Sequence, residues 1–420
     1  MNVLLINNYF PPEIGAASHL FYYLGKELAK RGHKVYVLTG VPRYNVSYEE
    51  YKHFTKNMDK ITHEVIDGMN VFRVKLPFVE RSKKIRRGLE HFEIANKLLR
   101  AGKKILKNKS IDVSLTYSPP LTLYKTAYKL GKQYNFPSIL NVQDLFPQAA
   151  IDLGIMKSKA IISFFKRLEK RAYEKSNLIT VHSETNAKYV EKIVNSEKVL
   201  VFENWIDINL IMPGEKRNKF SEENNLYDKF IISFAGTLGY SQDVEVILNA
   251  AEITKNHDIY YLIVGDGVKY EQLKLEKVKR NLRKIILLPP VPKEIYPLVL
   301  HTSDISLATL TKDVRTPVVP SKILSIMSAG IPVIATMNLD GDAPKLIEKA
   351  KAGYVLPAGD AKGLAEKILE LYNNPDLRKK LGKNGREYVE KNLSVQVAAD
   401  KYEEIFKRVI NEYKRRNKNG

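Results

Sequence analysis

A serine and a lysine open a helix-forming stretch, and together they point to phosphate chemistry. Residues 318–336 read "VVPSKILSIMSAGIPVIAT", so Ser321 and Lys322 fall at the expected start of a helix. The helix dipole is positive there, and an unpaired lysine at that end costs up to about 1 kcal/mol. A bound diphosphate reverses the sign, because backbone N–H groups, a hydroxyl and an ammonium then attract one anion. The alternative is a lysine directed into solvent, where the penalty nearly vanishes.

Two more candidates follow expected strands, at the edge where parallel sheets bind ligands. Gly15 lies in "PPEIGAAS" before a helix, and its missing Cβ lets backbone approach an anion closely. Asp144 ends "ILNVQD", at the carboxyl edge of an expected strand, where site residues collect in a parallel sheet. The structural alternatives are an ordinary turn for Gly15 and a helix N-cap for Asp144.

Other acidic residues fit structural roles better. "DGD" at 340–342 resembles a metal-binding pair, but the motif is short and common, so we predict no metal site and no cofactor. Asp266 in "VGDG" (264–267) is predicted to be a turn residue.

These residues need a scaffold of alternating strands and helices. Strand-like runs followed by helical patterns occur in two series, at 3–7, 31–40, 111–120, 136–144 and 176–183, and then from 229 to 357. This alternation predicts an α/β chain of two Rossmann-like domains that face each other across a cleft. We expect an N-terminal domain at 1–205, a linker at 206–228, a C-terminal domain at 229–393, and a helix at 394–420 that returns to the first domain.

Composition narrows the class of protein. The 420 residues include no Cys, which excludes disulfides, thiolate zinc sites and a cysteine nucleophile. The first residues lack a basic signal region, and the apolar runs are too short to span a bilayer. We therefore expect a cytoplasmic protein.

The net charge of +21 requires an explanation, and two basic segments contribute strongly. Residues 80–109 hold eleven Lys/Arg against three Asp/Glu, and residues 157–175 hold seven against two. Apolar residues are interleaved in both, at Ile85, Leu89, Phe92, Leu98 and Leu99, and at Ile161, Ile162, Phe164, Phe165 and Leu168. This pattern predicts a peripheral surface for anionic membrane on the inner face. The alternative is a pair of core-facing helices with solvated lysines.

Several stretches resemble glycosyltransferase family 4, and within it the WbuB-like (fucosamine-type) transferases of surface-polysaccharide assembly. They occur in family order over nearly the whole chain and read "NNYFPPEIGAASHLFYYLGKELAKRGHKVYVLT", "ENWID", "FAGTLGYSQDVEVILNAAE", "YYLIVGDG", "PSKILSIMSAGIPVIAT" and "AGYVLPAGD". The resemblance implies a GT-B fold and a retaining, metal-independent transferase. The implied partners are a nucleotide-sugar donor, with UDP favoured, and a lipid-linked glycan acceptor.

The resemblance also assigns roles to residues. It places the Gly15 loop at the donor diphosphate and acceptor, Asp144 at the anomeric centre, and the backbone near Val291 at the nucleobase. Donor phosphates are met by a family arginine after Gly236 and a lysine five residues later. Those positions are Thr237 and Gln242 in this chain, and neither is charged. Lys322 is then the natural substitute cation, with Arg315 as a weaker candidate.

Two family glutamates are also replaced, by Pro317 and Ser325. The second normally receives both ribose hydroxyls, whereas Ser325 could make one such bond. The departure keeps three alternatives open: a non-catalytic nucleotide-sugar or glycan-binding protein, an epimerase or phosphorylase of the same fold, and a nucleic-acid binder. The last is suggested by charge alone, because no nucleic-acid motif is visible, so we expect no nucleic-acid partner.

Overall fold

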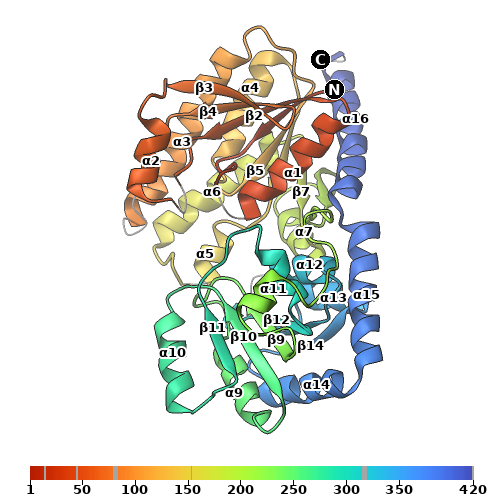
Figure 1. The fold of residues 1–420 in the computed structure, drawn as a ribbon. Coiled ribbons are helices and arrows are strands. Elements are labelled where there is room, and N and C mark those ends of the chain that lie inside the picture. Colours follow the sequence, from red (N-terminus) through yellow and green to blue (C-terminus); the bar gives the residue numbers. More distant parts are fainter. Residues whose placement is uncertain (14–15, 44–45, 79–83, 153, 315–318, 419–420) are drawn as a thin grey trace. The chain divides into compact units, whose positions relative to one another are not determined.

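The computed structural model describes residues 1–13, 16–43, 46–78, 84–152, 154–314 and 319–418. The chain divides into two compact units, each an open sheet with helices on both faces (Figure 1). Unit 1 comprises Met1–Trp205 and Val395–Gly420, and unit 2 comprises Ile206–Ser394.

Unit 1 holds an eight-stranded sheet in the order β3-β4-β2-β1-β5-β6-β7-β8, in which every neighbouring pair is parallel except β3 with β4. Its strands are β1 (Asn2–Ile6), β2 (Lys34–Gly40), β3 (Ile61–Ile66), β4 (Met69–Val74), β5 (Val113–Ser118), β6 (Ser138–Val142), β7 (Leu178–Val181) and β8 (Val199–Val201). Its helices are α1 (Ala16–Lys30), α2 (Tyr48–Thr55), α3 (Lys84–Ile105), α4 (Leu123–Tyr134), α5 (Gln148–Asp152), α6 (Lys159–Lys175), α7 (Glu184–Glu191), the short 3-10 helix η1 (Ser196–Lys198) and α16 (Val395–Lys418).

Unit 2 holds a six-stranded, fully parallel sheet in the order β11-β10-β9-β12-β13-β14. Its strands are β9 (Phe230–Ala235), β10 (Ile259–Val264), β11 (Ile285–Leu288), β12 (Ile305–Thr309), β13 (Val333–Met337) and β14 (Gly353–Pro357). Its helices are α8 (Lys219–Glu223), α9 (Glu245–Ile253), α10 (Tyr270–Lys279), α11 (Tyr296–His301), α12 (Ser321–Ser328), α13 (Asp342–Ala350), α14 (Ala361–Asn373) and α15 (Pro375–Asn392). The predicted α/β class with two parallel sheets is confirmed.

The sequence prediction missed the hairpin of β3 and β4 at the edge of the first sheet. Asp67 and Gly68 form its turn with φ angles of 45° and 80°, so both adopt the left-handed conformation that a two-residue hairpin needs. An Asp-Gly pair between two strand-like runs is a known hairpin signal. The alternation of strands and helices around it predicted parallel strands only, so the antiparallel pair was missed.

The expected linker at 206–228 is wrong as an independent segment, because these residues are packed within unit 2. Ile211, Phe220 and Leu226 are buried in its hydrophobic clusters. Arg386 of α15 donates to the carbonyls of Ile208 and Ile211 at 3.1 and 3.0 Å. The segment is mostly polar, and its few apolar residues are widely spaced, so its packing was not predicted from composition.

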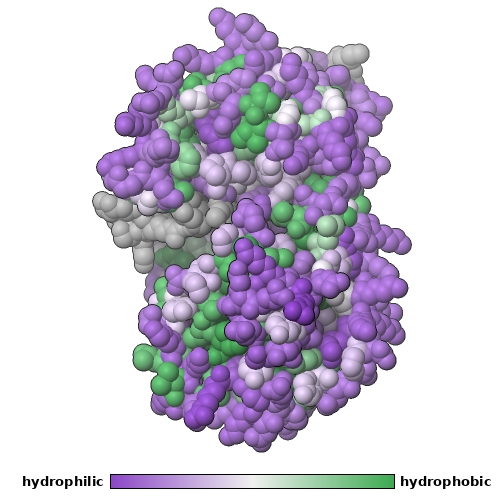
Figure 2. Space-filling model, in the orientation of Figure 1, coloured by the Kyte–Doolittle hydropathy of each residue, from purple (hydrophilic) through white to green (hydrophobic). Residues whose placement is uncertain are grey.

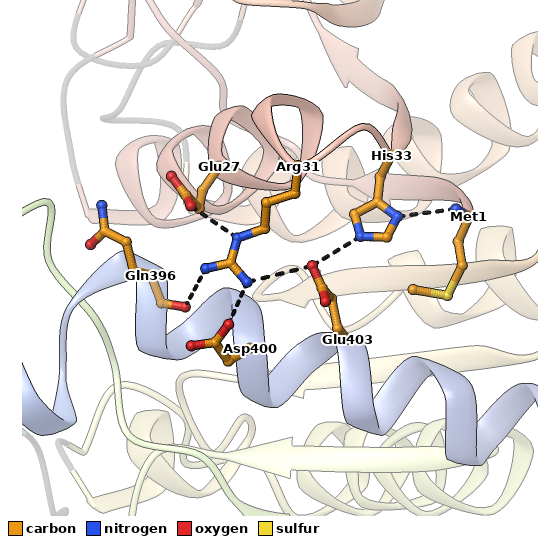
Figure 3. Close-up of polar contacts among 7 residues, drawn as sticks. All are labelled: Met1, Glu27, Arg31, His33, Gln396, Asp400 and Glu403. Carbon is orange, nitrogen blue, oxygen red and sulfur yellow. Dashed lines mark hydrogen bonds and ion pairs between the residues drawn. The ribbon is translucent and has the colours of Figure 1, made fainter.

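Helix α16 is fastened to α1 by a network that also reaches the N-terminus (Figure 3). Arg31, just after α1, donates to Asp400 at 2.5 Å and to the Gln396 carbonyl at 3.0 Å. Glu403 accepts from the His33 ring at 3.0 Å and faces Arg31. Underneath, Tyr402 and Phe406 are fully buried in the core of unit 1. The end of the chain is therefore an integral part of unit 1.

Candidate active site

The loop between β9 and α9 is held close to the end of β10 by glycines. Gly265 has φ +155°, and a Cβ there would lie 1.9 Å from the Gly236 carbonyl oxygen. Gly267 has φ +156°, and its Cβ would lie 2.5 Å from the Leu238 oxygen. Asp266 accepts from the Leu238 N–H at 2.9 Å and, through Oδ1, from the Gly267 N–H at 2.7 Å. The "VGDG" motif thus shapes this loop, and the predicted turn role of Asp266 is confirmed.

Lys322 folds back over β9 instead of extending into solvent. Its Nζ lies 3.6 Å from the centroid of the Phe234 ring and donates to Gln242 Oε1 at 3.1 Å. A Cβ on Gly236 would come within 3.2 Å of the same Nζ. The solvent-directed alternative is therefore wrong. The structure brings together three residues that the sequence selected separately, Gly236, Gln242 and Lys322.

The surroundings of Lys322 disfavour its charge. Desolvation lowers the pKa of Lys322 from 10.5 to about 7, and it is the one cause resolved for this group. Within the described ranges, the neighbours of the ammonium are a neutral amide and an aromatic face, and neither supplies a full negative charge. An anion bound at this position would raise the pKa and draw in a proton.

Ser321 is the first residue of α12 and does not cap it. Pro320 occupies the N-cap position, and no side chain makes a cap hydrogen bond. Ser321 and Thr237 are both exposed, and in the described part of the chain no hydrogen bond joins either hydroxyl to Lys322. The expected start of a helix at Ser321 and Lys322 is confirmed, and Pro320 directly precedes its first turn.

Ser325 contacts Tyr296, a residue that was not predicted from the sequence. Tyr296, the first residue of α11, is in contact with Ser325, and Val291 packs in the same hydrophobic cluster as Tyr296. Burial raises the pKa of Tyr296 to about 12, while the hydrogen bond with Ser325 opposes this rise. Ser325 Oγ also donates to the Ser321 carbonyl at 3.4 Å. The tyrosine hydroxyl therefore adds a second hydrogen-bonding group beside Ser325, the position where the resemblance implies a glutamate.

In unit 1, Asp144 lies just beyond β6 with an exposed side chain. Desolvation by surrounding protein raises the pKa of Asp144, and the nearby His182 opposes that rise. Burial raises the pKa of Tyr117, and the Asp144 charge adds to this effect. These three residues come from the carboxyl ends of β5, β6 and β7. His182 and Tyr117 were missed, although their positions at strand ends were a usable signal.

The backbone of Asp144 is braced by a pair of amides. Gln143 Nε2 donates to Asn204 Oδ1 at 2.8 Å, and Asn204 Nδ2 donates back to Gln143 Oε1 at 2.7 Å. Gln143 also donates to Asn141 Oδ1 at 2.8 Å. The "ENWID" stretch, which contains Asn204, therefore supports the segment that carries the candidate catalytic residue.

Some predicted residues cannot be placed. Gly15, Arg315 and Pro317 lie outside the described residues. Asp342 is in the first turn of α13, where a carboxylate suits the helix dipole. Across the described ranges no three acidic or histidine side chains gather as metal ligands.

Unit 1 also exposes apolar side chains on α6. Ile161 and Phe164 are 50% and 52% exposed. The Phe164 and Phe165 rings lie 5.2 Å apart, and Phe146 lies 5.0 Å from Phe165. On α3, by contrast, Leu98 and Leu99 are buried, so the core-facing alternative holds for that half of the helix.

Figure 2 shows one face of the molecule, which is mostly hydrophilic with smaller hydrophobic areas. None of the helices in the described ranges combines the length and the apolar character that crossing a bilayer requires.

Comparisons with known proteins agree with this arrangement. The family model "Glycosyltransferase Family 4" matches residues 15–210, and the model "Glycosyl transferases group 1" matches residues 215–388. The chain is 25% identical over 343 residues to the probable glycosyltransferase WbjE of Pseudomonas aeruginosa, covering 81% of this chain and 85% of that protein. It is 23% identical to the putative colanic acid biosynthesis glycosyl transferase WcaI of Escherichia coli, covering 83% and 86%.

Solved structures show the fold. Anabaena HepE, crystallised in complex with UDP, superposes with a TM-score of 0.69 at 15% identity and covers 97% of this chain and 100% of that one. The likeness identifies the two Rossmann-like units as those of the GT-B fold.

Proposed function

Because the chain belongs to the glycosyltransferase family 4 and group 1 enzymes, we propose that it moves a sugar from a nucleotide-sugar donor to a lipid-linked glycan with retention of anomeric configuration. The donor is a UDP-sugar, and the product enters cell-surface polysaccharide or glycoprotein glycan assembly, in the manner of WbuB-like transferases. The name of one relative, a putative colanic acid biosynthesis enzyme, supports a polysaccharide pathway, and the crystal structure of HepE with UDP supports a UDP-sugar donor.

The observation that carries the proposal is the partly buried Lys322 beside Gly236 and Gln242. A lysine held over an aromatic face, with a single amide acceptor, is poorly compensated in the free protein. A donor diphosphate would supply the missing negative charge, with the N-terminus of α12 adding its dipole. Thr237 and Ser321 are exposed close by in sequence and offer hydroxyls to the same phosphates.

On the nucleoside side, Ser325 and Tyr296 take the place of the family glutamate. Two hydroxyls can bond a ribose hydroxyl each, so we assign them the ribose, and the backbone at Val291 the base. Neither hydroxyl is charged, so their hydrogen bonds to the ribose are weaker than those of a carboxylate. Lys322 therefore contributes a larger share of the affinity for the donor.

Asp144 is the candidate catalytic residue of unit 1. Its exposed carboxylate could accept the acceptor proton or stabilise positive charge at the anomeric carbon. Desolvation raises the pKa of Asp144, and a raised pKa makes a carboxylate a stronger base, in keeping with the first role. The Gly15 loop completes the donor and acceptor side of this proposal.

A lipid-linked acceptor requires the enzyme to work at a membrane surface, and α6 offers the means. Ile161 and Phe164 are exposed on a helix that also carries Lys159 and Arg167. The aromatic cluster continues to Phe146, two residues after Asp144. Apolar side chains between cations are the pattern of an interfacial helix on anionic lipid, here the inner face of the cytoplasmic membrane.

The test is a thermal-shift panel of nucleotides and nucleotide sugars, followed by transfer of the best donor's labelled sugar to a membrane lipid extract. We expect UDP and one UDP-sugar to raise the Tm and the label to enter a lipid-soluble product. Binding without transfer to any extract would identify a non-catalytic binding protein. A free, altered sugar nucleotide would identify an epimerase.

A further inference from the structure

One residue, Lys269, bonds at two points to the β9–α9 loop that supports Lys322. Lys269 directly precedes α10, and its backbone N–H donates to the Leu238 carbonyl at 3.0 Å. Its side chain reaches across, and Nζ donates to the Gln242 carbonyl at 2.9 Å. Leu238 and Gln242 both lie within the β9–α9 loop (236–244), so Lys269 bonds to this loop at two points.

The Gln242 carbonyl bond matters because the side chain of the same residue meets Lys322. The Gln242 N–H is bonded to the Gly239 carbonyl at 3.1 Å, and the preceding Ser241 carbonyl accepts from Thr311 at 3.0 Å. With the carbonyl also fixed by Lys269, the peptide cannot rotate freely. The Gln242 side chain therefore leaves the backbone in one direction, toward Lys322.

Core packing fixes only part of the loop. Leu238 and Val244 are buried in the core of unit 2, whereas residues 239–243 between them are partly or fully exposed. A pocket of about 300 Å³ lies at the Val244 end, and Leu273 and Lys269 also line it. Where a loop lacks close packing, hydrogen bonds hold its conformation, and the bond from Lys269 to the Gln242 carbonyl is one of them.

We propose that Lys269 is a positioning residue for the donor: it holds Gln242 so that the Lys322 ammonium is presented to the donor diphosphate. The inference rests on the proposed function, and it adds a residue to which neither the sequence motifs nor the family comparison assigns a role. Lys269 acts through Gln242 and does not itself touch the phosphates.

The experiment compares the affinities for UDP and for uridine, because their difference measures the contribution of the diphosphate to binding. Isothermal titration gives both dissociation constants for the wild-type chain and for Lys269→Met, Lys269→Arg, Lys322→Met and Lys274→Met. Lys274 is the matched control, since it is an exposed lysine on the same helix α10. Methionine keeps the aliphatic length of lysine and removes its donor, so the cavity stays lined.

We expect Lys269→Met to weaken UDP binding by about tenfold, the worth of one well-placed hydrogen bond, while uridine binding is unchanged. Lys269→Arg should restore most of the loss, and Lys274→Met should match the wild type. Equal loss of UDP and uridine affinity would show general damage to unit 2 and overturn the inference. Wild-type UDP affinity in Lys269→Met would overturn it as well.

The pH dependence of UDP affinity distinguishes a positioning role of Lys269 from a purely electrostatic effect of its charge. Around Lys322, the contacting residues are Phe234, Gly236 and Gln242. Two charged residues adjoin Gln242: Asp243, which follows it and accepts from the Val246 N–H, and Lys269, which donates to the Gln242 carbonyl. UDP affinity should fall as the pH rises above about 7, where Lys322 loses its proton. If Lys269 positions Gln242, its loss removes an acceptor from Lys322, and the midpoint shifts to lower pH. A shift to higher pH would mean that Lys269 was only a repelling charge.

The proposed donor site and the proposed role of Lys269 would be contradicted by different results. If Lys322→Met loses UDP discrimination but Lys269→Met does not, the donor site stands and the positioning role is wrong. If no nucleoside diphosphate binds the wild-type chain better than its nucleoside, the proposed donor site is wrong, and the role of Lys269 falls with it.

Discussion

Lys322 Nζ donates to Gln242 Oε1 at 3.1 Å, so the lysine of α12 is held by a residue at which the family resemblance implies a phosphate-binding lysine. The positive charge is that of Lys322 on α12 and not of a residue in the β9–α9 loop. The loop residue Gln242 accepts a hydrogen bond from it. This pairing explains how a chain without the usual charged clamp could still offer one positive charge to a diphosphate.

Replacing Lys322 by methionine should weaken UDP binding by about 10- to 100-fold, because a charge-assisted contact to phosphate is lost. Isothermal titration measures it, with Lys274→Met as the control. A Lys322→Met protein that binds UDP like the wild type would remove Lys322 from the donor site.

The same variant should be at least as stable as the wild type near neutral pH. The folded-state pKa of about 7 lies below the ordinary 10.5, so the folded chain carries the cost of a buried charge below pH 7. That cost fades as the pH rises from about 7 to about 10.5, and wild-type stability should increase relative to Lys322→Met over this window. Urea unfolding at several pH values measures the difference, and a pH-independent gap would contradict the burial of a titrating amine.

Asp144→Asn should lower turnover by about 10²- to 10⁴-fold while UDP affinity stays within about twofold, because asparagine keeps the shape and removes the base. Once a donor is known, steady-state transfer and UDP titration together measure this. Asp152→Asn, a change of an acid on α5, is the control. Unchanged turnover in Asp144→Asn would leave Asp144 with a structural role.

Replacing Ile161 and Phe164 by serine should reduce sedimentation with vesicles that contain anionic lipid. Burying each apolar side chain is worth about 1.5–3 kcal/mol, and these two are half exposed. Leu275 and Val278 of α10 are 69% and 75% exposed and give a matched pair of serine substitutions in unit 2. Equal losses for both pairs, or no preference for anionic vesicles in the wild type, would refute docking through α6.

Glu403→Gln should destabilise unit 1 by about 1 kcal/mol at neutral pH, because its contacts with His33 and Arg31 lose their charge. Desolvation works against ionisation, yet the His33 and Arg31 contacts hold the pKa of Glu403 below 4.5. The contribution is present above about pH 4.5 and is lost as the pH falls through the lowered value.

Thermal unfolding from pH 7 down to about pH 3 checks this, with exposed Glu404→Gln as the control. We expect the wild type and Glu403→Gln to converge at the acid end. A constant gap would show that the glutamate acts through packing alone.

Much of the fold was predictable because strands and helices leave periodic patterns. The β-α alternation indicated two parallel sheets, and the glycines of "VGDG" indicated a tight turn whose purpose the structure then showed. The hairpin at Asp67 and Gly68 was readable but overlooked. The packing of residues 206–228 was not readable, because Ile211, Phe220 and Leu226 are spaced without a period.

By itself, the sequence determined the residue types at the candidate site and their order along the chain, including a lysine where the helix dipole disfavours one. Only the tertiary structure decided what that lysine does, because its burial, its ring contact with Phe234 and its bond to Gln242 join segments some eighty residues apart. A side chain's pKa depends on the atoms around it, and these are set by packing, not by neighbours in sequence. The same holds for Lys269, whose role becomes visible only across the folded loop.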